Sequence, residues 1–142
     1  MAEKNNKTAE DNGQQVVQLM QESKRNIMIY QGQITLLRKK YNALGYAEEQ
    51  LIAYQTEMEI HRSKLVDVSV LSDASWEGKN REDYDAAVYD EVYSVTYPVY
   101  IRNIQELVSA IQTRMAELEN SIAAYEEDIR TESRKVLQAC MW

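Results

Sequence analysis

The chain has 142 residues, of which 27 % are charged and 44 % hydrophobic, a composition typical of one globular or coiled-coil domain. Four glycines and one proline are too few to supply the turns of a protein built from many short strands, which excludes all-β folds. The net charge is −7 and no basic stripe is present, which argues against nucleic-acid binding because phosphates are neutralised by clustered Lys and Arg. A single cysteine excludes an internal disulfide and a cysteine-based zinc site.

The first residues of the chain differ in composition from the rest. Residues 1–13 are polar and charged and end at a glycine, which predicts a disordered tail followed by one domain over residues 14–142. This segment has no positively charged start followed by an apolar core, so we expect no cleaved signal peptide. No stretch approaches the roughly 18 apolar residues of a membrane span, so we expect no membrane insertion.

A helical period begins at Gln14 and predicts one long helix over residues 14–71. Apolar positions, together with one histidine, step by three and four, as in a heptad seam. They are Ile27, Tyr30, Ile34, Leu37, Tyr41, Leu44, Ala47, Leu51, Tyr54, Met58, His61, Leu65 and Val68. Two steps of three follow each other at Leu44 and Ala47, which predicts a phase shift or a kink beside Gly45.

The second half of the chain predicts further helices after a break. Ser, Asp, Gly and Asn gather in residues 71–80, as in a turn. A short apolar series then predicts a helix over 79–95, and a longer one predicts a last helix to about 138. The longer series is Ile101, Ile104, Val108, Ile111, Met115, Leu118, Ile122, Tyr125 and Ile129. Pro98 lies between the two series and predicts a break or sharp kink at 96–98.

These elements predict an all-α fold, an antiparallel two-helix hairpin or coiled coil with its turn near residues 76–79 and a break near Pro98. Residues 92–101 also have the β-branched and tyrosine content of a strand, but a single strand would have no partner, so helix is preferred. A hairpin of two helices shields few side chains on all sides. We therefore expect the protein to associate with itself or with another helical chain.

The tyrosines provide candidate contacts for such an association. Four tyrosines follow one another at intervals of four, four and three residues, and they are Tyr89, Tyr93, Tyr97 and Tyr100. They would form one aromatic edge if the helical period holds across Pro98. The alternative, which is equally consistent with the sequence, is that these rings cover the hairpin's own core instead of binding a partner. Ile104 and Ile111 complete the set of candidate partner-binding residues.

The residues of catalytic and metal sites are missing from the sequence. His61 is the only histidine, and the Glu-x-x-His signature of di-metal bundles fails because Met58 stands where the glutamate is needed. The acidic run over residues 82–91 lacks the glycine of a calcium loop, and no glycine-rich phosphate loop is present. We therefore expect no catalytic residue, no metal and no cofactor, and a protein that is not an enzyme.

Trp76-Glu77-Gly78 stands inside the predicted turn, where glycine eases the reversal and tryptophan can cover the open end of the helix pair. This combination resembles the WXG-motif helical hairpins of type VII (ESX-type) secretion in Gram-positive bacteria. Over about residues 15–135 the chain is similar to the YwqH-like small helical proteins encoded beside LXG toxins. The residues that carry the likeness are Trp76, Gly78, Arg81, Tyr84, Asp85, Tyr93, Tyr97, Tyr100, Ile101, Ile104, Ile111, Leu118 and Ile122.

The resemblance implies a targeting partner or chaperone that binds the helical N-terminal domain of an LXG toxin, with a second small helical protein as a further partner. The chain lacks the tyrosine-based export signal of secreted members, because none of its ten tyrosines is followed four residues later by Asp or Glu. It also lacks the variant of this signal that begins with phenylalanine, because it contains no phenylalanine. The chain is longer than the secreted members as well. These departures favour a protein that stays in the cytoplasm or is secreted with its partner. The alternatives are a secreted WXG-type homodimer and a plain coiled-coil scaffold unrelated to secretion.

Overall fold

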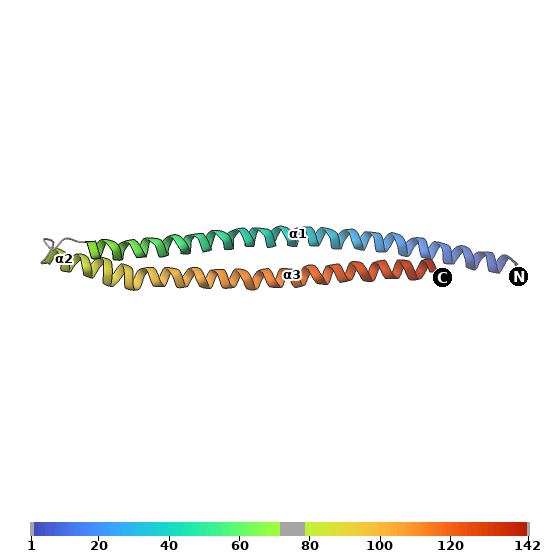
Figure 1. Ribbon diagram of the computed structural model, residues 1–142. Helices are drawn as coiled ribbons and strands as arrows, with labels where there is room; N and C mark the ends of the chain where they lie inside the picture. Colours follow the sequence, from blue (N-terminus) through green and yellow to red (C-terminus); the bar gives the residue numbers. More distant parts are fainter. Residues whose placement is uncertain (1, 72–78, 142) are drawn as a thin grey trace. The chain divides into compact units, whose positions relative to one another are not determined.

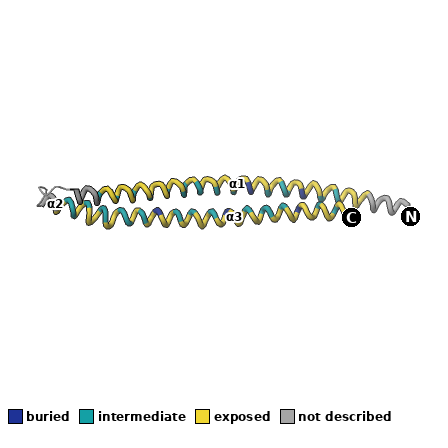
Figure 2. The backbone as a smooth tube through the Cα atoms, in the orientation of Figure 1, coloured by how far each residue is buried: buried dark blue, intermediate teal, exposed yellow. Residues whose placement is uncertain are grey.

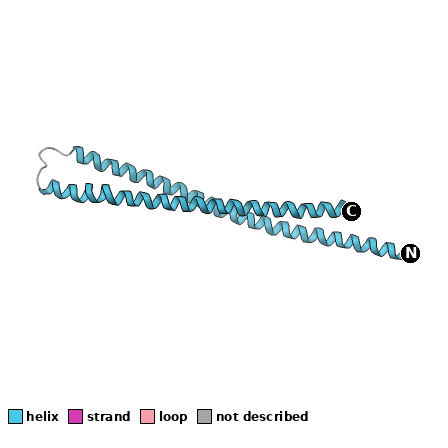
Figure 3. Cartoon of the chain, turned by 90° about the horizontal axis from the view of Figure 1, so that it is seen from below, coloured by secondary structure: helices cyan, strands magenta, loops and turns pink. Residues whose placement is uncertain are grey.

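A computed structural model of the chain describes the backbone of residues 2–71 and 79–141, and the side chains of residues 10–65 and 82–141. The described elements are the α-helix α1 (Ala2–Leu71), the short α-helix α2 (Lys79–Tyr84), the π-helix η1 (Asp85–Thr96) and the α-helix α3 (Tyr97–Met141) (Figure 1). Within the described residues every element is helical and none is a strand (Figure 3). The predicted all-α class is confirmed, as are the predicted end of the first helix at 71 and the restart at 79.

The contacts divide the chain into two compact units, and each contains one piece of both arms. The first unit comprises Met1–Asn42 and Ala116–Trp142, and the second comprises Ala43–Met115. In the first unit, hydrogen bonds join Ser23 to Glu132 and Tyr41 to Glu119, so residue numbers rise along α1 as they fall along α3. In the second unit Arg62 bonds to Tyr93. The helices are therefore antiparallel within the first unit, as the hairpin prediction requires.

Buried and half-buried positions follow one side of each helix, and we call this row of positions the seam (Figure 2). All nine residues of the predicted heptad series over Ile101–Ile129 are buried or half-buried, which confirms the series. The same alternation continues beyond it at Glu132, Val136 and Ala139. Only Ile34, Ile104 and Leu118 are buried hydrophobic residues among the described side chains.

The predicted phase shift beside Gly45 is wrong. A row of half-buried positions in α1 keeps the alternating steps of four and three after Leu44, and it consists of Glu48, Leu51, Gln55, Met58, Arg62 and Leu65. Gly45 and the predicted Ala47 are half-buried beside this row. Tyr54 and His61, which were expected in the seam, are exposed. The prediction failed because it followed apolar residues, whereas the geometry of the helix pair places polar residues with long apolar stems in the seam.

Two further boundaries differ from the prediction. The helix α1 begins at Ala2, within the segment of residues 1–13 that was expected to be a disordered tail, and residues 10–13 of that segment are exposed. No proline interrupts this segment, and polar or charged residues are compatible with a solvated helix. Near Pro98 the chain changes from π-helix to α-helix between Thr96 and Tyr97, where a break or sharp kink was expected.

Glycine is dispensable inside α1, which leads to a test of helix stability. A Cβ atom added at Gly32 would meet nothing within 4 Å, and one added at Gly45 would lie 3.6 Å from Met115 Cε, an ordinary contact. We expect Gly32→Ala and Gly45→Ala each to raise the free energy of unfolding by about 1 kcal/mol, because alanine favours helix over glycine. Urea denaturation followed by circular dichroism measures the change. A loss of stability in Gly45→Ala alone would show that the backbone bends there.

Candidate interaction surfaces

A buried polar cluster lies in the seam of the first unit. Ser23 is 1 % exposed and Glu132 is 7 % exposed. Ser23 Oγ donates a hydrogen bond of 2.8 Å to Glu132 Oε2, while Asn26 Nδ2 and Lys135 Nζ donate to Oε1 at 3.5 Å and 3.3 Å. The Ser23 hydroxyl, followed by Lys135 and Asn26, lowers the pKa of the Glu132 carboxyl below its ordinary value, although burial acts against this. Glu132 is therefore held as a satisfied carboxylate.

The Ser23–Glu132 cluster specifies the pairing register of the helices. A heptad seam tolerates a slip of seven residues, because apolar residues then meet other apolar residues. A slip would bring Val16 or Tyr30 to the place of Ser23 and remove the small hydroxyl donor from Glu132. A buried carboxylate without its donors is unfavourable, so the cluster disfavours the slipped pairings.

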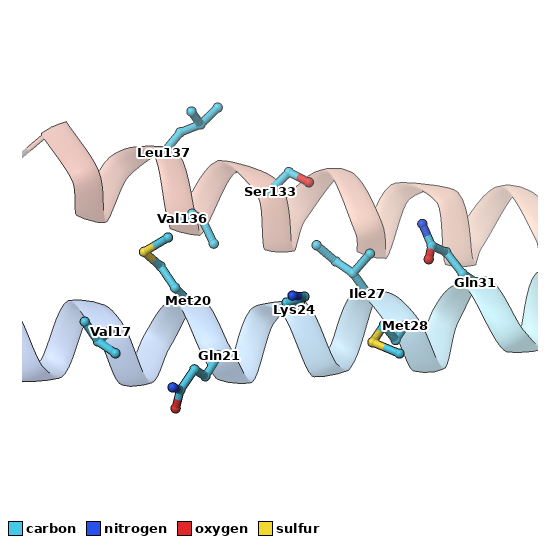
Figure 4. Close-up of a pocket in the computed structure, with 10 residues that line it drawn as sticks. All are labelled: Val17, Met20, Gln21, Lys24, Ile27, Met28, Gln31, Ser133, Val136 and Leu137. Atoms are coloured by element: carbon cyan, nitrogen blue, oxygen red, sulfur yellow. The ribbon is translucent and has the colours of Figure 1, made fainter.

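An open apolar groove of about 810 Å³ borders this cluster in the first unit (Figure 4). We define the apolar groove by its hydrophobic lining, which consists of Val17, Met20, Ile27, Met28, Val136 and Leu137. Figure 4 shows Met20, Ile27 and Val136 in the space between α1 and α3. Met28 is 64 % exposed and Leu137 is 63 % exposed, so large apolar side chains of both helices are open to solvent. The rim is polar and contains Gln21, Lys24, Gln31 and Ser133.

The apolar groove carries positive charge on an otherwise acidic protein. The two segments that line it, residues 17–31 and 133–141, contain one acid, Glu22. Against it stand four bases, Lys24, Arg25, Arg134 and Lys135, but Lys135 is paired with Glu132, so three bases remain and the net charge of these segments is +2, compared with −7 for the chain. Glu132 precedes the second segment, but its carboxylate is turned into the seam toward Ser23. A ligand with negative charge along one edge suits this surface.

The structure separates the predicted partner-binding residues into open and enclosed groups. Tyr89 and Tyr100 are 43 % and 54 % exposed, and the ring of Tyr89 stacks on that of Tyr93 with centroids 5.1 Å apart. Tyr93 and Tyr97 are half-buried. Ile104 and Ile111 lie in the seam, and Ile104 is only 8 % exposed. Tyr89 and Tyr100 are thus the members of the set most accessible to a partner, while the predicted turn residues Trp76 and Gly78 lie outside the described residues.

The π-helix η1 explains how the chain passes Pro98 without leaving helical structure. The backbone N–H of Tyr97 bonds to the carbonyl of Val92, five residues earlier. Side chains follow the same register, since Ser94 Oγ donates to Tyr89 O and Thr96 Oγ donates to Glu91 O. In this register the next carbonyl, that of Tyr93, would accept from residue 98, which is a proline without an N–H.

Arg62 of α1 supplies the donor that Pro98 lacks. Arg62 Nε donates to the carbonyl oxygen of Tyr93 at 3.1 Å, and its guanidinium carbon lies 4.4 Å from the centroid of the Tyr93 ring. The first contact satisfies a carbonyl that has neither an α nor a π partner on its own helix, and the second is a cation–π contact. Both contacts fix the position of the stacked Tyr89 and Tyr93 rings relative to α1.

Sequence reasoning missed the Ser23–Glu132 cluster, the apolar groove and Arg62. Extending the seam over polar residues would have found the first, because Ser23 precedes Ile27 by four and Glu132 follows Ile129 by three. The same extension places Arg62 in the seam, four residues after Met58 and three before Leu65, but nothing in the sequence indicates that its partner is a carbonyl 31 residues away. Among the described residues no three His, Cys, Asp or Glu side chains gather as a metal site, and no described helix is long and apolar enough to cross a membrane.

No protein-family model, curated protein or solved structure matches the chain. The likeness to type VII secretion proteins therefore stays a prediction that rests on the sequence motifs quoted above.

The role of Arg62 can be tested by a double-mutant cycle with Pro98. We expect Arg62→Ala to lower the free energy of unfolding by about 1–3 kcal/mol, because it removes a charged hydrogen bond and a cation–π contact. In the Pro98→Ala background the loss should shrink, since residue 98 then donates its own N–H. Arg102→Ala, which removes an exposed arginine near the same site, serves as the control. Equal losses in both backgrounds would contradict the assigned role.

The lowered pKa of Glu132 predicts a dependence of stability on pH. Since the pKa is lower in the folded state, the ionised carboxylate stabilises the fold fully above its ordinary pKa of 4.5, and this contribution is lost as the pH falls through the folded value. We expect the urea midpoint to fall more between pH 7 and pH 3 in the parent protein than in Ser23→Ala. Ser133→Ala, a change at an exposed serine of α3, should leave the pH profile unaltered. Identical profiles for the parent and Ser23→Ala would contradict the cluster's role.

Proposed function

We propose that this protein is a non-enzymatic partner that pairs its helices with those of another chain. The observation that carries this proposal is the excess of open apolar surface over core. Among the described side chains, the buried hydrophobic residues are Ile34, Ile104 and Leu118. Large hydrophobic side chains that are 43–85 % exposed lie on both α1 and α3.

The geometry of two paired helices accounts for this excess. Each helix of a pair buries one stripe against the other, and the rest of its circumference remains open. Val17, Met28 and Leu137 lie outside the seam and are more than half exposed. Helices from a second chain can cover such residues and convert the pair into a three- or four-helix bundle, in which a core is enclosed on all sides.

We further propose that the partner is the helical N-terminal domain of an LXG toxin and that the protein acts as a targeting partner or chaperone in type VII secretion. The support for this finer proposal is the Trp76-x-Gly78 motif between two helical arms, together with the tyrosine series that follows it. The exposed rings of Tyr89 and Tyr100 provide apolar faces with polar tips, as is common at protein interfaces. The protein acts in the cytoplasm or is secreted with its toxin.

Mixing this protein with the N-terminal helical domain of the LXG toxin encoded beside it tests the proposal. We expect one complex on size exclusion with light scattering, because the exposed apolar faces of both chains are covered on binding. Trp76→Ala should weaken binding at least about tenfold while helicity is retained, and Trp142→Ala, a change at the other tryptophan, should leave binding intact.

The other outcomes separate the alternatives. Two separate peaks at micromolar concentrations would contradict the role as a toxin partner. A stable dimer of this chain alone that does not bind the toxin domain would favour the homodimer. Unchanged binding in Trp76→Ala would show that the turn motif is incidental to recognition.

A further inference from the structure

We propose that the apolar groove of the first unit is the docking site for a single amphipathic helix whose flanks are acidic. This inference rests on the proposed function, since it names the part of the surface and the kind of helix through which a partner is held. The site combines an apolar floor in the seam, at Ile27 and Val136, with exposed apolar walls and a polar rim in which Lys24 is the charged residue.

The dimensions and lining of the apolar groove suit a helix. Its residues on α1 extend from Val17 to Gln31, a length of about 21 Å or four helical turns at 1.5 Å per residue. The wall residues Val17, Met20 and Met28 occur at spacings that place them along one side of α1. A partner helix with apolar residues at i, i+3, i+4 and i+7 can insert them between the two helices. Met20 and Met28 have unbranched side chains that adapt to the shape of an incoming residue.

Charge selects the flanks of the docked helix. Lys24 stands on the rim, and Arg25 and Arg134 are exposed on the same segments of α1 and α3. None of the three is joined to an acid by a salt bridge within the described residues, and Arg134 makes only the weaker electrostatic interaction that helps to lower the pKa of the Glu127 carboxyl. Glu or Asp residues beside the apolar stripe of the partner helix would pair with these bases, and a basic helix of equal hydrophobicity would be repelled.

The same charges disfavour a second copy of this chain as the occupant. In a two-fold dimer formed through the apolar groove, each patch meets its own copy. Lys24 and Arg134 of one protomer would then approach the bases of the other protomer and repel them. Glu22 is the single acid in the lining segments, residues 17–31 and 133–141, that can offset this repulsion. An acidic amphipathic helix from a different chain avoids this repulsion.

A pair of synthetic peptides of about 21 residues tests the site without any toxin. Both carry leucine at heptad positions a and d, and they differ only at e and g, which hold glutamate in one peptide and lysine in the other. Each peptide repels its own copies through these positions, which limits self-association. Fluorescence anisotropy with the full chain should give at least about tenfold tighter binding of the glutamate peptide, and the difference should shrink as salt is raised.

Variants of the protein locate the peptide. Leu137→Glu places a like charge in the wall of the apolar groove and should abolish binding of the glutamate peptide. Leu36→Glu makes the same change at an exposed leucine of the first unit outside the groove, and it should leave binding unchanged. Circular dichroism checks that both variants keep the helical content of the parent.

Equal binding of both peptides, or equal effects of the two variants, would overturn the proposed site. A dimer of the full chain that Leu137→Glu dissociates would overturn the choice of occupant. The toxin-domain experiment is independent of these results. If the toxin domain binds Leu137→Glu as it binds the parent, this site fails and the proposed function stands; if the glutamate peptide binds and the toxin domain does not, the proposed function fails and the site stands.

Discussion

Two antiparallel helices can shield only the stripe along which they touch, and this limit determines most of what the structure shows. The stripe contains the buried side chains of Ile34 and Leu118, while residues of similar size such as Met28 and Leu137 remain open. A longer hairpin does not escape the limit, because each added turn brings new exposed surface together with new seam. Association with further helices is the remaining way to enclose a core, and the proposed function follows from that requirement.

Polar residues give the seam the specificity that a repeating apolar pattern lacks. In the first unit, the carboxylate of Glu132 finds its donors in Ser23, Asn26 and Lys135. In the second unit, Arg62 reaches the carbonyl of Tyr93, which Pro98 leaves without a donor from its own helix. Each arrangement is satisfied in one pairing of the helices, so apolar contacts supply attraction and polar contacts select the register.

The interaction surfaces of the two units differ in chemistry. The apolar groove of the first unit is lined by aliphatic and thioether side chains, and its polar rim contains Lys24. The surface around η1 presents the exposed ring of Tyr89, which stacks on the half-buried Tyr93 ring that Arg62 contacts. A partner with one acidic amphipathic helix would use the first, whereas a partner that offers polar groups to tyrosine hydroxyls would use the second.

The amino-acid sequence by itself determined the helical class, the ends of the helices near residues 71 and 79, and the seam over Ile101–Ile129, because these depend on the period of apolar residues along one helix. It did not determine which polar residues complete the seam after Leu44, nor the π-helix or the apolar groove. Only the tertiary structure decided that Glu132 and Arg62 enter the seam while Tyr54 and His61 stay outside. The physical reason is that a polar side chain is buried where a partner on the other helix satisfies it, and for Ser23 and Glu132 that partner is 109 residues away.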